Sequence, residues 1–478
     1  MPRIPLVAAC CLLGLGTAPA LAATHDWSRF GFDAARSNFS TAVAGIRASD
    51  LAHLRRQDVT VPGTVDSSPI YLHAVQVKGK KRDVFIATTS YGRTFALDAR
   101  NGHRLWTFSP PSIGSLQGSY RITHSSPIAD RASGFVYAAS PDGKVRKISI
   151  ASGKQVVSGS WPVRITRLPS REKIGTALNL SGNNLIATTG GYTGDAPPYQ
   201  GHVVLIDKGS GKIVRVFNAL CSNRRGLIDP STCSETGSAI WARSGAVVVP
   251  GTGQILVATG DGNFNGHSNW GDSVLELASD LKHLVGNWTP SDESSLDSGD
   301  VDLGATAPAL LPFGSRWLAL QGGKDAKLRL LDVGNLNRHG KACGCKGGQL
   351  QTLDAPGGGV FTAPAVWRHN GKTWAFVATF SGAAAYRLDG TSKPRLHLVW
   401  STGRSGTSPI IAGGLLYVYS PGGDVAVYRP ATGHRVGTLS AGGGHWSSPI
   451  VADGRVAIPV GDANDHSTSG TITIYRRP

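Results

Sequence analysis

Side chains that could bind a metal ion or move a proton gather in the middle third of the sequence. Asp261 and Asn263 lie in a Gly-Asp-Gly-Asn run, and both offer the hard oxygen atoms that Ca²⁺ needs. Asp300 and Asp302 follow, and a carboxylate close to a bound ion could accept the proton of a hydroxyl group. A simpler alternative stays open, because aspartate and asparagine are also ordinary turn and cap residues.

Two further side chains could contact a ligand. The indole of Trp241 offers a broad aromatic face. Lys324, in a Gly-Gly-Lys-Asp run, offers a positive charge. The alternatives are core packing for Trp241 and a solvated turn for Lys324. The six candidates fall in four separate stretches between residues 241 and 324, so only an architecture that gathers several loops at one point would bring them together.

One short pattern recurs along the chain: a small, mostly hydroxyl residue, a small residue, proline and an apolar residue, followed by a short apolar strand. Clear copies begin at residues 67, 125, 306, 362, 407 and 447, and weaker copies begin at residues 176 and 238. A repeat of roughly 40 to 65 residues lies in the range of β-propeller blades. We expect the proline to begin the innermost strand of each blade, where a missing N–H is tolerated.

The rest of each copy is typical of two hairpins. In the first copy, strands at 84–89, 94–98 and 104–108 are separated by turns, the second of which contains Asn101-Gly102. Asn-Gly between apolar runs is a strong hairpin signal. The sequence therefore predicts an all-β fold, an eight-bladed β-propeller of four-stranded antiparallel blades. Aromatic residues of the outermost strands are expected to pack on the neighbouring blade: Trp106, Phe217, Trp288 and Trp400.

Composition agrees with one large repeat domain. The chain has 478 residues, of which 62 are glycine and only 17% are charged, as suits short strands and tight turns. We expect a single propeller over residues 23–478. The formal net charge of +17 is spread along the chain, with its densest cluster at 78–82. Because no nucleic-acid motif accompanies this charge, it indicates solubility and affinity for anionic polymers of the cell envelope.

The N-terminus resembles an export signal. Residues 1–22 contain a short apolar run and end in Ala-Leu-Ala, which predicts cleavage near Ala22 and a periplasmic or secreted protein. A lipid anchor at Cys10 is an alternative. No later segment is long and apolar enough for a membrane helix. In an oxidising compartment we expect Cys221 and Cys233 to pair, whereas Cys343 and Cys345 form either a second loop disulfide or part of a metal site.

Residues 96–106 resemble the tryptophan-docking motif of the quinoprotein (pyrroloquinoline quinone, PQQ) dehydrogenase repeat, and the resemblance extends over 26–478. In that family an N-terminal strand completes the last blade. The resemblance implies that Trp241 forms the floor under the quinone and that Asp261, with Asn263 nearby, binds Ca²⁺. It also implies that Lys324 contacts the quinone oxygens. Asp302, or next Asp300, would be the general base in oxidation of an alcohol or polyol.

The sequence also departs from that family. The adjacent cysteine pair above the quinone is missing from the mature chain, and so is the Ca²⁺-binding glutamate of the third blade, near which only Asp195 is found. No Cys-x-x-Cys-His motif is present, so an enzyme would pass electrons to an external acceptor. The alternative is a non-catalytic envelope scaffold, similar to the outer-membrane assembly lipoprotein, that binds envelope proteins or anionic polymers.

Overall fold

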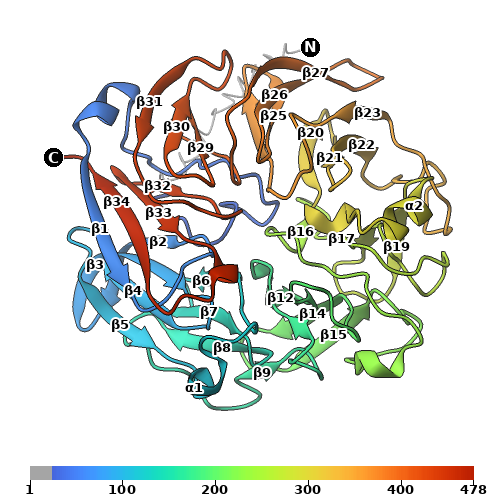
Figure 1. Cartoon of the computed structure of the whole chain (residues 1–478), viewed down its shortest axis with the longest axis horizontal. Helices are drawn as coiled ribbons and strands as arrows, with labels where there is room; N and C mark the ends of the chain where they lie inside the picture. Colours follow the sequence, from blue (N-terminus) through green and yellow to red (C-terminus); the bar gives the residue numbers. More distant parts are fainter. Residues whose placement is uncertain (1–23) are drawn as a thin grey trace, which may run out of the picture.

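The computed structural model describes residues 24–478, which form eight four-stranded antiparallel sheets arranged around a common axis (Figure 1). The predicted eight-bladed propeller is therefore confirmed, whereas the predicted signal peptide and its cleavage site lie outside the described residues. The strands of each blade are given from the innermost outward. Blade 1 contains β2 (Ile70–Val77), β3 (Lys80–Thr88), β4 (Thr94–Asp98) and β5 (Arg104–Phe108), and blade 2 contains β6 (Ile128–Asp130), β7 (Phe135–Ser140), β8 (Lys144–Ser149) and β9 (Val163–Arg164). Blade 3 contains β11 (Asn179–Ser181), β12 (Asn184–Thr188), β14 (His202–Asp207) and β15 (Ile213–Asn218), and blade 4 contains β16 (Val247–Val248), β17 (Ile255–Ala258), β18 (Val274–Leu277) and β19 (Leu284–Trp288).

The second half of the ring repeats this order. Blade 5 contains β20 (Ala309–Phe313), β21 (Arg316–Gln321), β22 (Lys327–Asp332) and β23 (Gln351–Asp354), and blade 6 contains β24 (Ala365–His369), β25 (Lys372–Ala378), β26 (Ala383–Asp389) and β27 (Arg395–Thr402). Blade 7 contains β28 (Ile410–Ala412), β29 (Leu415–Tyr419), β30 (Val425–Tyr428) and β31 (Arg435–Leu439), and blade 8 contains β32 (Ile450–Ala452), β33 (Arg455–Val460), β34 (Gly470–Arg476) and β1 (Arg55–Val61). Short elements in the connecting loops are β10 (Glu172–Lys173), β13 (Gly190–Gly191), α1 (Ile113–Leu116), α2 (Glu293–Ser298) and the 3₁₀ turns η1 (Ala48–His53), η2 (Pro230–Thr232), η3 (Leu303–Ala305) and η4 (Ala463–Asp465).

The ring closes between the two ends of the described chain. Strand β1 pairs antiparallel with β34, from Arg55 opposite Arg476 to Val61 opposite Gly470, and so becomes the outermost strand of blade 8 (Figure 1). The expected N-terminal closing strand is confirmed. Closure matters physically because it leaves no blade without a neighbour on either side.

The recurring proline step builds the hub. In six blades the proline directly precedes the innermost strand rather than beginning it, and hydroxyl groups of the step join neighbouring blades. Ser68 Oγ lies 2.9 Å from Ser448 Oγ, and the Ser68 N–H donates to Ser126 Oγ at 2.8 Å. In blade 4 the weak copy at residue 238 does not lead directly into its strand, because β16 begins only at Val247.

Aromatic side chains of the outer strands join each blade to the next, as predicted. Trp106 Nε1–H donates to the carbonyl of Ile150 at 2.9 Å, and Trp400 Nε1–H donates to that of Pro430 at 2.7 Å. Phe217 and Trp288 pack into the apolar layers between their own and the next blade. Trp161, which the sequence analysis did not single out, docks on blade 3 through the carbonyl of Gly209 at 3.2 Å.

The segment 24–47 crosses the axis before β1 begins. Its carbonyl groups accept from the inner strands of several blades, with Ser28 O bonded to Ala129 N, Ala34 O to Val248 N and Ser37 O to Val366 N. The buried guanidinium of Arg36 adds bonds to the carbonyls of residues 177 and 178. Because these partners surround the axis, the segment forms a floor across the centre of the propeller.

Both cysteine pairs form disulfides. Cys221 and Cys233 are joined, as predicted, and Cys343 is joined to Cys345, which supports the second loop disulfide over the metal alternative. Within residues 24–478, every helix is too short or too polar to cross a lipid bilayer.

Candidate functional site

A cavity of about 360 Å³ opens at the axis above this floor. Most of its walls are loops that lead into the innermost strands, so residues from several blades face one another across it. The loop before β16 supplies Trp241, the loop before β20 supplies Asp302, and the turn between β21 and β22 supplies Lys324. The propeller therefore brings together side chains that the sequence separates.

Asp302 is the centre of a rigid polar cluster. Its Oδ2 lies 2.6 Å from Lys324 Nζ, and its Oδ1 accepts from Trp241 Nε1 at 3.3 Å and from the Asp261 N–H at 3.0 Å. The Asp302 carbonyl also accepts from the Lys324 N–H at 3.0 Å. Lys324 Nζ in addition lies 2.7 Å from Asp300 Oδ1. Five of the six predicted site residues therefore meet at one place.

Three carboxylates of this cluster crowd together. Oxygen atoms of Asp261, Asp300 and Asp302 lie within 4.8 Å of one another. Burial, the hydrogen bond to Asp302 and repulsion by that group raise the pKa of Asp261 to about 9. Burial alone would raise the pKa of Asp302, but the Asp261 hydrogen bond and the Lys324 ammonium lower it below its ordinary value. Near neutral pH, Asp261 thus carries a proton and Asp302 carries the negative charge.

The remaining predicted residue, Asn263, is not part of the cluster. Its side-chain oxygen accepts from Asn269 Nδ2 at 3.0 Å, and it lines a neighbouring hollow with Asp297. Between the two residues lies Gly262, which has φ 144° and no room for a Cβ; Asp261 contacts Asp302, whereas Asn263 lines the other hollow. Asn263 therefore lines a different hollow from the predicted site. The side chains that lie close to the Asp261 carboxylate are those of Asp300 and Asp302.

Asp195 enters the same cavity from blade 3. Burial and repulsion by Asp302 raise the pKa of its carboxyl. Asp195 is thus a carboxylate that blade 3 contributes to the cavity, although the sequence lacks the glutamate that the resemblance implies for this blade. Because both oxygens of Asp302 are occupied by donors, that residue is a weak base in this arrangement. The side chain of Asp300 is 69% exposed, and within residues 24–478 its carboxylate pairs only with Lys324.

The sequence analysis missed an aromatic wall and a buried cation. Phe361 and Trp446 stack with a centroid distance of 5.0 Å, and Trp446 lies 5.8 Å from Trp241. Lys173 is buried beside them, and burial, then repulsion by Arg243, lower its pKa to about 8. A signal for the wall was present, because Phe361 and Trp446 each directly precede a proline step, the position from which the chain enters the hub.

A buried ionic network lies deeper in the hub. Arg243 bonds to Asp66 Oδ1 at 2.8 Å, and His445 Nδ1 lies 2.7 Å from Asp66 Oδ2. Burial would raise the pKa of Asp66, but Arg243 and the neighbouring His445 and His124 lower it strongly. Arg243 also lies over the ring of Trp446, at 5.4 Å from the centroid. The network therefore supports the wall of the cavity from beneath.

Comparisons with known proteins agree with the fold and the repeat. Residues 60–164 match a protein family described as outer membrane protein assembly factor BamB. No curated protein sequence matches the chain. Together with the structural likenesses below, the family match confirms the predicted resemblance to the PQQ-type propeller repeat.

Three solved structures have the same fold at low sequence identity. Quinohemoprotein alcohol dehydrogenase from Comamonas testosteroni is 16% identical, with a TM-score of 0.69 over 95% of this chain and 81% of that one. A europium-containing methanol dehydrogenase is 13% identical, with a TM-score of 0.66 over 95% of this chain and 98% of that one. BamB from Moraxella catarrhalis is 12% identical, with a TM-score of 0.52 over 88% and 99%. At these identities the likeness shows the fold alone.

Proposed function

We propose that this chain is an exported quinoprotein dehydrogenase that oxidises an alcohol or polyol, with PQQ and Ca²⁺ as cofactors. The observation that carries the proposal is the convergence of Trp241, Lys324, Asp300 and Asp302 in one cavity at the propeller axis, with the carboxylate of Asp261 close to those of Asp300 and Asp302. The overall likeness to a quinohemoprotein alcohol dehydrogenase and to a methanol dehydrogenase agrees with it. Export to the periplasm or medium follows from the N-terminal sequence, and the electrons would pass to an external acceptor.

The residues of the cavity fit a planar, anionic quinone. Trp241 supplies an aromatic face, and Phe361 and Trp446 form a wall beside it. Lys173 and Lys324 are cations that suit the carboxylates and oxygens of PQQ. The carboxylates of Asp261, Asp300 and Asp302 suit Ca²⁺, and an ion there would relieve their mutual repulsion. When bound, PQQ supplies the two-electron acceptor that the side chains of the chain lack.

The chain itself would orient the alcohol and remove its proton. Asp300 is the freer base, because its side chain is 69% exposed and, within residues 24–478, pairs only with Lys324. Asp302 is held by Trp241 and Lys324 and would fix both groups in place, and it becomes a stronger base only where Lys324 turns to another partner. Lys324 would stabilise negative charge on the reacting ligand.

Reconstitution with PQQ and Ca²⁺ tests the proposal. The purified chain is titrated with PQQ while the absorbance of the quinone and the dye-coupled oxidation of alcohols and polyols are followed. We expect saturable binding and turnover, and at least tenfold weaker PQQ binding in Lys324→Gln. The matched control is Lys327→Gln, because Lys327 is an exposed lysine of the adjoining strand that bonds only to Asp354. For Asp300→Asn, which removes the freer base, we expect bound PQQ without turnover.

Two results would reject parts of this proposal. Unchanged turnover in Asp300→Asn would reject that residue as the base. An unchanged quinone spectrum at micromolar PQQ would instead favour a scaffold that binds envelope proteins.

One observation favours such a scaffold. The outermost strand β27 exposes the side chains of Leu398 to 58% and Val399 to 40%, and they form an apolar edge to which a strand of a partner protein could add. Under that outcome, binding of envelope proteins should fall in Leu398→Lys.

A further inference from the structure

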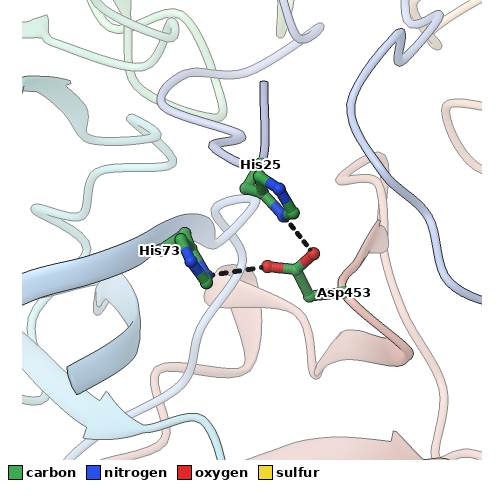
Figure 2. Close-up of side chains that lie close together, drawn as sticks. All are labelled: His25, His73 and Asp453. Atoms are coloured by element: carbon green, nitrogen blue, oxygen red, sulfur yellow. Dashed lines mark hydrogen bonds and ion pairs between the residues drawn. The ribbon is translucent and has the colours of Figure 1, made fainter. Parts of the chain in front are cut away.

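A second cluster of metal-ligating side chains lies away from the cavity. The Nδ1 atoms of His25 and His73 face the two oxygens of Asp453, at 2.6 and 3.0 Å respectively (Figure 2). The two imidazole rings stack with centroids 4.5 Å apart. One ligand atom from each of the three residues lies within 4.8 Å of the others. Two imidazoles and one carboxylate thus converge on one point.

The fold builds this convergence from three distant segments. His25 begins the segment that crosses the hub floor, His73 lies in β2 of blade 1, and Asp453 lies in the turn between β32 and β33 of blade 8. The pairing of β2 with β3 shifts register between Leu72 and Val75, and such a bulge re-aims the side chains within it. This turn follows β32, whereas the loop of the cavity precedes it, so the cluster lies at the opposite end of the inner strands.

Backbone contacts hold the three segments in place. The Asp453 N–H donates to the carbonyl of Val43 at 2.8 Å, and the His73 N–H donates to Asp26 Oδ1 at 2.7 Å. Tyr71 Oη donates to Asp453 Oδ2 at 2.9 Å and orients the carboxylate. Such an outer contact is typical of carboxylates that ligate metals. The ligand atoms are therefore positioned by the fold itself.

The charge of Asp453 is left for a cation. Within residues 24–478, its carboxylate forms ion pairs only with His25 and His73, and with no lysine or arginine. The nearby Arg455 does not pair with this carboxylate: one of its nitrogens donates to the Asp453 carbonyl at 3.0 Å and to Tyr71 Oη at 3.1 Å, and another lies 3.2 Å from Asp83 Oδ2. The side chains of His25 and His73 are 37% and 41% exposed, so an ion and a water molecule can reach the site.

We propose that His25, His73 and Asp453 form a site for Zn²⁺ or a chemically similar divalent transition metal. Imidazole nitrogens and one carboxylate are ligands that Zn²⁺ accepts in a tetrahedron, with water in the fourth position. Calcium is a poor ligand match, because it prefers oxygen atoms alone. The site differs in this respect from the all-oxygen cluster of the cavity, and it does not depend on the function proposed for that cavity.

A bound ion would link three segments close to the point where the ring closes. It would join the first described residues to blade 1 and to blade 8, whose outermost strand β1 closes the ring. Metal binding to the folded state alone raises thermal stability by mass action. The buried group of Asp66, His124 and His445 offers no equivalent site, because the Arg243 guanidinium already neutralises its carboxylate.

The test is a titration of the full chain, freed of metals with a chelator and carrying no polyhistidine tag. We expect one Zn²⁺ per chain, a visible absorption band of four-coordinate Co²⁺ that Zn²⁺ abolishes, and no competition by Ca²⁺. At a Zn²⁺ concentration of 100 times its Kd, the Tm should rise by about 3 °C. In His25→Ala and in His73→Ala the affinity should fall at least tenfold.

The matched control is His53→Ala, which removes an exposed histidine of η1 that does not belong to the cluster and should keep full affinity. His73 lies within a strand, so circular dichroism checks the fold of its variant. His25 lies outside the strands and tests the site even where His73→Ala fails to fold. Equal Zn²⁺ affinity in the wild-type chain and in His25→Ala would overturn the proposal, as would the absence of a Co²⁺ band.

Discussion

Replacing Asp66 by asparagine should destabilise the whole propeller, because it leaves a buried arginine without its counter-charge. The guanidinium of Arg243 is 3% exposed, and its main partners are Asp66 Oδ1 at 2.8 Å and the Asp66 carbonyl at 2.7 Å. Asparagine keeps the shape of the side chain but removes its charge. Breaking a buried ion pair in this way costs about 3–5 kcal/mol.

This cost can be converted into a shift of Tm. For a chain of 478 residues, the entropy of unfolding is about 1 kcal/mol per degree, so Asp66→Asn should lower the Tm by about 3–5 °C. Scanning calorimetry measures the shift. The control is Asp280→Asn, which breaks an exposed pair with Lys282 and should leave the Tm within about one degree of the wild type.

A double variant separates charge from shape. In Asp66→Asn/Arg243→Met the guanidinium charge is removed together with its counter-charge, so the loss should be smaller than the sum of the losses in the two single variants. Additive losses would show that the two residues are not coupled. A Tm of Asp66→Asn within one degree of the wild type would refute the electrostatic argument altogether.

Two further predictions concern other parts of the fold. Because the buried Lys173 has a pKa of about 8 against an ordinary 10.5, the folded chain binds fewer protons there than the unfolded chain between these pH values. The free energy of unfolding, measured by urea denaturation, should therefore rise for the wild type relative to Lys173→Met between pH 8 and 10.5, by up to about 3 kcal/mol. If the difference between the two proteins stays constant over this pH range, the lowered pKa of Lys173 is contradicted. Gly433→Ala should lower the Tm by about 2–4 °C, because φ is +69° and a Cβ would lie 2.6 Å from the Trp400 ring. Gly414→Ala, with φ +74° and open space, should lower it by only about 1 °C, and equal shifts would argue against the docking contact.

The propeller itself could be predicted because its signals are local. The two adjacent residues Asn101-Gly102 are enough to predict a hairpin turn. The proline step, which is four residues long, is enough to predict where an inner strand begins. Each outer tryptophan, such as Trp106, meets a turn of the next blade, so the same contact recurs around the ring. Repetition allows one recognised copy to support the others, and eight copies define the ring.

The composition of the sites was decided by tertiary structure. Asp261 and Asn263 are two residues apart, yet Asp261 joins the carboxylate cluster with Asp300 and Asp302, whereas Asn263 lines a neighbouring hollow. Lys173 carries no sequence signal for burial, because its place depends on how the loops of several blades fold over the hub.

The same holds for the second cluster. His25 and Asp453 are 428 residues apart and meet only because the ring closes. Short-range patterns in the sequence thus determine strands, turns and the number of blades. Which side chains share a cavity or a metal site depends on loop conformations and on the closure of the ring, and these are properties of the assembled chain.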